Sequence, residues 1–149
     1  MAEYFGKSEQ QKKRAYSPAV ITQGGKTVWL AGQTATQDEQ GKDISGNFEA
    51  QVRTIFGLLD KTLKGAGGSL ANMVTMTVFI IDPRHGDRFV EMRGGFFPDG
   101  SYPASALITV AGLARPEMLV VRRCAWRRHR PFRRDSRGGT SLFAFYRTR

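Results

Sequence analysis

Few residues of this 149-residue chain have the types and spacings that a catalytic centre needs. The two histidines, His85 and His129, belong to different segments, and the single cysteine, Cys124, has no second cysteine with which to build a zinc or redox site. The glycine-rich stretch 65–68 follows a helical pattern, so it predicts a helix end rather than a phosphate-binding loop. We therefore expect no metal site and no cofactor.

Basic residues concentrate at the C-terminal end of the chain. Thirteen basic residues stand against twelve acidic ones in residues 1–121, whereas ten arginines stand against Asp135 alone in residues 122–149. This change in composition marks the start of an Arg-rich C-terminal extension, 122–149. The polar stretch 7–14 predicts a flexible N-terminal segment, 1–15, and the domain is expected over 16–121.

Three origins of the extension 122–149 are open. Its arginines, interleaved with Trp126 and Phe132, could form a nucleic-acid arm that contacts phosphates and stacks on bases. It could also be a solvated or anion-binding extension without a specific partner, or the product of a shifted reading frame. We favour the shifted frame, because the composition changes inside the apolar strand pattern that begins at 118. Non-specific nucleic-acid binding by the tail is predicted in every case, since it follows from charge alone.

The same composition indicates a cytoplasmic protein. One cysteine cannot form an internal disulfide, which favours a reducing compartment. Residues 1–33 contain no apolar run long enough for a signal peptide or a membrane span, so no membrane partner is expected.

Apolar periodicity predicts two helices and five strands. The clearest helix covers 47–65, where Asn47 can cap the first turn. Its apolar stripe consists of Phe48, Val52, Ile55, Phe56, Leu59 and Leu63. A second helix is expected over 87–97, and strands over 19–22, 27–31, 74–81, 104–110 and 118–121. The first two strands flank Gly24-Gly25 and are expected to form a hairpin. This order predicts an α+β fold, a mostly antiparallel sheet with two helices packed on one face.

Several segments in order resemble the RidA/YjgF family. They are RAYSPAV, WLAGQTA, the helix that starts at Asn47, MVTMTVFIID, the FVEM and FFPDGSYPAS block, and LITVAGLARPEMLV. The resemblance covers residues 16–121 and implies a chorismate-mutase-like α+β subunit. It also implies a homotrimer with clefts between subunits, and hydrolysis of reactive enamines and imines such as 2-aminoacrylate and 2-iminopropanoate to the 2-oxo acid and ammonia.

That chemistry needs a group that holds the substrate carboxylate, ideally an arginine fork, and a group that orients the attacking water. By position, the resemblance assigns catalytic roles to Tyr16, Ser105 and Val120. The family has an arginine at the position of Ser105 and a glutamate at that of Val120. It also has a Gly-Pro pair before the aromatic residue that matches Tyr16, where this chain has Arg14-Ala15. The resemblance assigns substrate-binding positions in the same way to Ala31, Gly32 and Leu107. Arg115, in the loop before the last strand, is an alternative cation for binding the substrate.

The missing arginine and glutamate leave three functions open. The first is imine hydrolysis, weakened or altered in its choice of substrate. The second is binding of a small metabolite without turnover, and the third is a role with RNA or in translation through the basic tail. Under the first, the change Ser105→Arg is expected to raise affinity for 2-oxo acids.

Overall fold

The computed structural model describes residues 2–5 and 8–128. In chain order the elements are β1 (Ala2–Phe5), α1 (Glu9–Lys13), β2 (Ala19–Thr22), β3 (Lys26–Gln33), α2 (Phe48–Gly65), η1 (Leu70–Asn72), β4 (Met73–Ile80), η2 (Pro83–His85), α3 (Gly86–Gly95), β5 (Ala104–Thr109) and β6 (Val120–Arg128). Apart from the two N-terminal elements and two short 3-10 turns, this is the predicted order of strands and helices.

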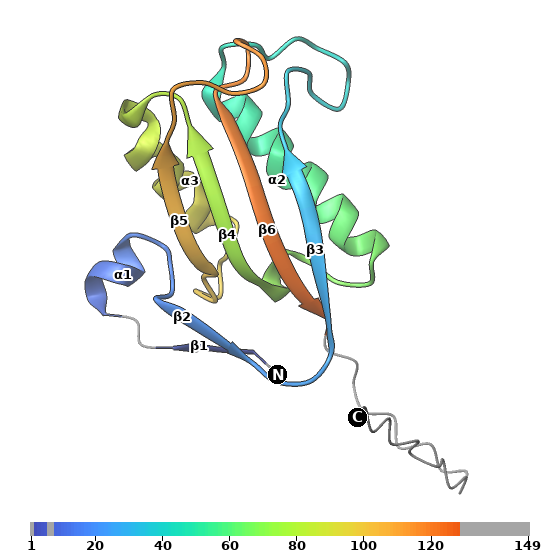
Figure 1. Cartoon of the computed structure of the whole chain (residues 1–149), viewed down its shortest axis with the longest axis vertical. Helices are drawn as coiled ribbons and strands as arrows, with labels where there is room; N and C mark the ends of the chain where they lie inside the picture. Colours follow the sequence, from blue (N-terminus) through green and yellow to red (C-terminus); the bar gives the residue numbers. More distant parts are fainter. Residues whose placement is uncertain (1, 6–7, 129–149) are drawn as a thin grey trace, which may run out of the picture.

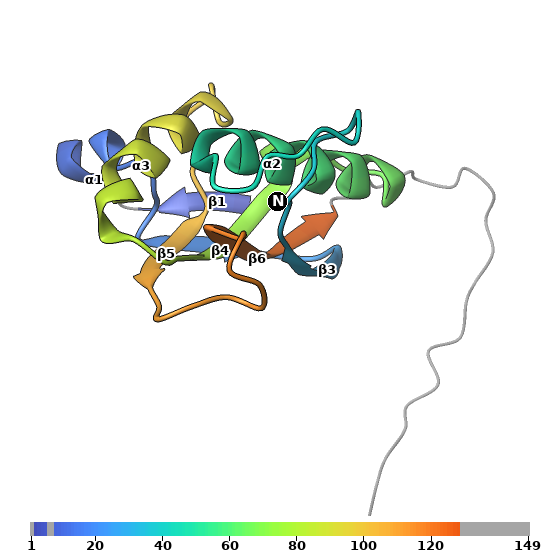
Figure 2. The same ribbon diagram turned by 90° about the horizontal axis from the view of Figure 1, so that it is seen from above.

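A four-stranded sheet with the strand order β3-β6-β4-β5 forms the centre of the fold (Figure 1). The pairs β3–β6 and β6–β4 are antiparallel, and β4–β5 is parallel. Helices α2 and α3 lie side by side on one face of this sheet, as the view from above shows (Figure 2). The predicted α+β class and the helices on a single face are confirmed.

Helix α2 supplies most of the core on that face. The side chain of Asn47 accepts a hydrogen bond from the Ala50 backbone N–H at 3.1 Å, which caps the first turn. The whole predicted stripe is buried, from Phe48 to Leu63. Because these side chains recur every three or four residues, they all face the sheet and pack on the inward residues of β4 and β6.

Two predicted details of the strands are wrong. Strand β2 pairs with β1 and strand β3 pairs with β6, so the chain turns at Gly24-Gly25 without forming the expected hairpin. In the pairing of β4 with β6 the register shifts between Met73 and Thr75. Met73 is therefore buried, whereas strict alternation with Met76 and Val78 predicts that Val74 is the buried residue. A bulge of this kind leaves no mark in a hydrophobic pattern, because it depends on the partner strand.

The N-terminal segment contains strand β1 and the short helix α1, where the sequence predicts a flexible stretch. Ser8 and Gln11 form a capping box: the Gln11 backbone N–H donates to Ser8 Oγ, and the Ser8 backbone N–H donates to Gln11 Oε1. After the helix, the guanidinium of Arg14 pairs with Asp87 of α3. These contacts tie the segment to the edge of the sheet that carries β5.

Strand β6 runs through the change in composition without a break and lies in the middle of the sheet. Arg122 points to the helices and is fully buried, with its guanidinium 3.8 Å from the ring centroid of Phe56. Its only hydrogen bond runs to the Met73 sulfur at 3.0 Å, and its Nε and Nη1 find no partner among the described residues. The rest of the Arg-rich extension, from 129 on, lies outside the described residues.

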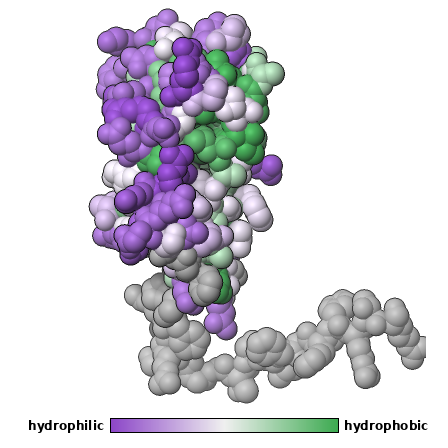
Figure 3. Space-filling model, turned by 90° about the vertical axis from the view of Figure 1, so that its left-hand side faces the viewer, coloured by the Kyte–Doolittle hydropathy of each residue, from purple (hydrophilic) through white to green (hydrophobic). Residues whose placement is uncertain are grey.

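The face of the sheet opposite the helices is uncovered in a single chain. It carries Trp29 on β3, 74% exposed, and Ile108 on β5, 42% exposed. Viewed from the β5 side of the molecule, hydrophobic residues gather along one flank and hydrophilic residues along the other (Figure 3). These two side chains stand on the opposite edge strands of that face, with β6 and β4 between them. Among the described residues, no helix has the length and apolar character that crossing a membrane requires.

Candidate functional site

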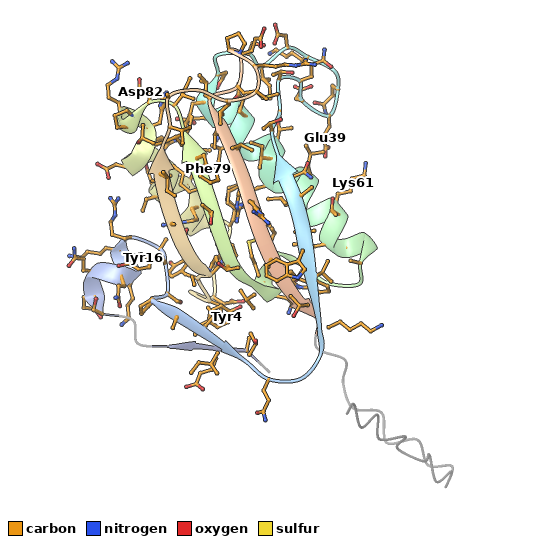
Figure 4. All side chains as sticks on the ribbon, in the orientation of Figure 1. Tyr4, Tyr16, Glu39, Lys61, Phe79 and Asp82 are labelled. Carbon is orange, nitrogen blue, oxygen red and sulfur yellow. The ribbon has the colours of Figure 1, made fainter. Side chains whose placement is uncertain are left out.

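Tyr16 and Ser105 come together at the edge of the sheet that carries β5. Ser17 forms a parallel bridge with Ala104, and its hydroxyl donates to the Tyr102 carbonyl at 2.5 Å. These bonds hold the segment between α1 and β2 against the start of β5, and Figure 4 labels Tyr16 in that segment. Two of the three predicted catalytic positions therefore lie on adjacent segments, one residue before and one residue after the Ser17–Ala104 bridge, and each is half-buried.

An arginine that the sequence analysis missed lies against Ser105. The side chain of Arg93, from helix α3, donates from Nη1 to Ser105 Oγ and from Nη2 to the Arg14 carbonyl, each at 2.5 Å. The side chain is only 3% exposed. Its guanidinium therefore joins helix α3, strand β5 and the N-terminal segment at one point.

Arg93 is a buried cation without an anionic partner among the described residues. Both of its hydrogen bonds go to neutral oxygens, and its Nε has no partner within the same residues. Burial, together with the smaller effect of the positive charge of Arg14, lowers the pKa of Arg93 to about 10. The ring of Phe89, whose centroid is 5.5 Å from the guanidinium carbon, is the aromatic face that it contacts.

Ala31 and Gly32 lie at the opposite edge of the sheet, at the end of β3. Strands β6 and β4 separate β3 from β5, so three strand spacings of 4.8 Å put these residues roughly 14 Å from the β5 edge. Both residues are exposed. A single chain thus holds the predicted positions in two groups, one at each edge of the sheet.

Val120 and Leu107 point into the core on the helix side. Val120 is 1% exposed and pairs with Ile80, whereas Ser105 pairs with Met76 of the same strand. Four residues along a strand separate these two levels by roughly 13 Å. In one chain, Val120 is therefore an interior residue away from Ser105, and Leu107 packs on the hydrophobic core.

Arg115 is exposed in the loop between β5 and β6. It lines a shallow surface pocket with Thr36, Gln37, Asp43, Ser45 and Glu117. This pocket lies beside the end of β3 and not at the start of β5. Within residues 2–5 and 8–128, no cluster of three or more histidine, cysteine or acidic side chains could hold a metal ion.

A signal for Arg93 does exist in the sequence. In the predicted helix over 87–97, it stands four residues after Phe89 and three before Phe96, on the apolar stripe of the helix. An arginine at such a position either buries its charge with the apolar residues or turns its side chain out to solvent. Either case marks it as a residue to examine. The pattern cannot show which group lies opposite, because Ser105 comes from a strand that packs there only in the fold.

Comparison with known proteins agrees with this architecture. Residues 7–121 match the family model described as Endoribonuclease L-PSP, and the chain belongs to this family, that of the Rid/YjgF proteins. The matched region ends at the residue where the composition changes. Protein DfrA of Myxococcus xanthus is 30% identical over 100 residues, which cover 67% of this chain and 76% of that protein. A RutC family protein of Pyrococcus horikoshii is 24% identical over 75% of this chain and 86% of its own length.

Solved structures of the family have the same fold. YyfB of Yersinia pestis, a protein of unknown function of the conserved Rid family, gives a TM-score of 0.76 at 21% identity, over 85% of this chain and 98% of its own. A putative endoribonuclease of Thermotoga maritima gives a TM-score of 0.62 at 27% identity, over 76% of this chain and 87% of its own. The chorismate-mutase-like fold expected from the sequence is thereby confirmed.

Proposed function

We propose that this protein hydrolyses reactive 2-imino acids, such as 2-iminopropanoate and its enamine tautomer 2-aminoacrylate, to the 2-oxo acid and ammonia. Membership of the Rid/YjgF family supports the proposal, since the matched residues 7–121 include Tyr16 and the whole of β5. The observation that carries it for this chain is the half-site at the β5 edge. There the segment that carries Tyr16 lies against the start of β5, and Ser105 of that strand accepts a hydrogen bond from a buried guanidinium.

The reaction makes modest demands on the protein. Water attacks the electrophilic imine carbon, a C–O bond forms, and the electron pair of the C=N bond moves to nitrogen, which takes up a proton. The carbinolamine then loses ammonia as its C–N bond breaks, and the oxygen proton is lost as the carbonyl forms. The site must therefore hold the carboxylate, orient the water and pass protons. The hydroxyl of Tyr16, in the segment held against the start of β5, is the group to which we assign the orientation of the water.

The division of the predicted positions between two edges favours a cleft shared by two copies of the chain. A second copy packed on the uncovered sheet face could bring Ala31 and Gly32 of its β3 towards Tyr16 and Ser105. Exposed Trp29 and Ile108 on that face would be buried in such an assembly. We propose that the protein is a homotrimer assembled through this face, with three such clefts.

A timed imine assay tests the proposal. An amino-acid oxidase generates 2-iminopropanoate from alanine, semicarbazide traps the surviving imine, and micromolar protein is added. Faster loss of imine than in buffer is expected, with Tyr16→Phe slower and Tyr4→Phe unchanged, since Tyr4 lies on β1 and donates to Met73 outside the site. No acceleration by the wild-type protein would refute the proposal.

Binding of a small metabolite without turnover is the second candidate function. Val120, an apolar and buried residue at the family's acidic position, favours it, because no carboxylate stands there to activate water. Saturable binding of a 2-oxo acid without loss of imine would support this candidate. The RNA-related alternative depends on the basic tail, most of which lies outside the described residues, and it stays a prediction. Its test is binding that exceeds that of a charge-matched peptide at physiological salt.

A further inference from the structure

We propose that Arg93 is the residue that binds the substrate carboxylate, with its guanidinium delivered from helix α3 to the place where the family carries an arginine on β5. The inference depends on the proposed function for the chemistry of the substrate. The contacts of Arg93 give the reasons for choosing this residue.

Position is the first reason. Nη1 of Arg93 lies 2.5 Å from the Oγ of Ser105, so its guanidinium occupies the space next to the side chain at the family's arginine position. A serine there is short enough to leave that space open. An arginine at 105 would have to fill the same space.

A second departure from the family pattern contacts the same group. The family has a Gly-Pro pair where this chain has Arg14-Ala15, and the Arg14 carbonyl accepts from Nη2 of Arg93. Ala15 itself has a positive φ of 51°, and it packs on Gly94, the residue after Arg93, where an added Cβ would lie 3.9 Å from the Ala15 Cβ. The changes at 14, 15 and 105 are therefore joined in space through Arg93 and its neighbour.

Unsatisfied charge is the third reason. Within the described residues, the guanidinium of Arg93 has only neutral acceptors, and its Nε–H has none at all. A buried cation in this state lacks the counter-ion that would offset its loss of hydration. A carboxylate that accepts two N–H groups side by side supplies that charge in the geometry that a guanidinium favours.

The surroundings of Arg93 distinguish it from Arg122, the other arginine that is buried among the described residues. The residues around its guanidinium reach the surface: Ser105 and Tyr16 are half-buried and the Arg14 side chain is 45% exposed. Arg122 has unpaired N–H groups too, but it is fully buried between Phe56 and Met73. Arg88, which lines a surface pocket at the start of α2, is already bonded to Glu49 and Glu91.

Titration calorimetry with pyruvate, the stable product analogue, tests the assignment. We expect wild-type protein to bind pyruvate saturably and the uncharged analogue pyruvamide at least tenfold more weakly. Arg93→Met should lose at least tenfold in affinity, and the double change Arg93→Met/Ser105→Arg should recover most of it by restoring a guanidinium on β5. The sequence alone predicts a gain for Ser105→Arg, but with Arg93 already in that space we now expect none, because the change sets two guanidiniums against each other. Arg122→Met, which removes an equally buried arginine elsewhere, should bind pyruvate within twofold of wild type.

Several results would overturn the assignment. They are absence of pyruvate binding by the wild type, equal binding by Arg93→Met, and equal loss in Arg122→Met. Should Arg93→Met fail to fold in a thermal melt, Arg93→Lys takes its place, because it keeps the charge but loses the fork. It should bind several-fold more weakly, and wild-type affinity in Arg93→Lys would also overturn the assignment.

The imine assay separates this inference from the proposed function. Hydrolysis that persists in Arg93→Met would leave the proposed function in place and refute the assignment of Arg93 as the carboxylate-binding residue. Pyruvate binding that depends on Arg93, without faster loss of imine in the wild type, would support that assignment and refute hydrolysis.

Discussion

Replacing the buried Arg122 by methionine should stabilise the protein. Arg122 lies in the core with its guanidinium over Phe56, and its one hydrogen bond runs to the weak acceptor Met73 Sδ. Burial lowers the pKa of Arg122 to about 9, with a nearby charge from Arg93 acting in the same direction. A methionine keeps the length of the side chain and its contact with the aromatic ring but removes the charge.

The size of the effect follows from that environment. Lowering the pKa of Arg122 from the ordinary value of an arginine to about 9 corresponds to roughly 5 kcal/mol against the charged form in the folded state. The contact with the face of Phe56 offsets about 2 kcal/mol. Replacing buried ionic groups by apolar ones of similar volume stabilises proteins by about 1–4 kcal/mol. We therefore expect a gain of about 2–3 kcal/mol in the free energy of unfolding.

Chemical denaturation at pH 7 and a fixed protein concentration measures this gain, because assembly would make stability depend on concentration. For a chain of this length, the expected rise in Tm is roughly 4–12 °C. Arg84→Met is the matched control: its side chain is 88% exposed and pairs with Asp82 at the surface, so its effect should stay within about 0.5 kcal/mol.

The pH dependence provides an independent check. Since the pKa of Arg122 is lower in the folded protein than in the unfolded chain, its cost is full below about pH 9 and declines as the pH rises towards 12.5. The difference in stability between wild type and Arg122→Met should therefore shrink above pH 9. A variant that is no more stable than wild type at pH 7, or a difference that grows with pH, would refute this reasoning.

Three further predictions concern the frame of the site. Gly68→Ala should lower the free energy of unfolding by about 1–3 kcal/mol in a urea titration, because the added Cβ would lie 1.7 Å from the Trp126 ring. In the control Gly65→Ala the added Cβ meets no atom within 4 Å, and equal stability of the two variants would contradict this packing. Gln51→Leu should cost about 2–4 kcal/mol, since it removes bonds from Nε2 to the Ile44 and Glu117 carbonyls and from the Leu119 N–H to Oε1; an unchanged midpoint would show that these bonds contribute nothing. Trp29→Asp should reduce the sedimentation coefficient to that of a monomer, whereas Thr54→Asp on the helix side should not; a monomeric wild type would contradict the proposed assembly.

Much of the fold could be predicted from local patterns. The stripe from Phe48 to Leu63 fixes α2, and the order of strands and helices after it follows from alternation and turn residues. Strand pairing could not be predicted, because β2 and β3 flank a good turn yet pair with β1 and β6. Strands distant in the sequence decide which strands pair, because β6 lies between β3 and β4 and bonds to both.

The site was less predictable than the fold. Tyr16 and Ser105 were predicted through resemblance, and the structure places them on adjacent segments at the β5 edge. Arg93 was overlooked because position-by-position comparison looks for an arginine at 105 and not for one that reaches the same place from a helix. Val120 was assigned a catalytic position, but in a single chain it is an interior residue of β6, and only an assembled cleft could change its neighbours.

The imine assay on wild type and Arg93→Met, side by side, tests the central claim most directly. The account predicts that micromolar wild-type protein removes 2-iminopropanoate faster than buffer and that Arg93→Met loses at least tenfold of this acceleration, while Arg122→Met keeps it. Equal rates for wild type and buffer, or equal rates for wild type and Arg93→Met, would contradict it.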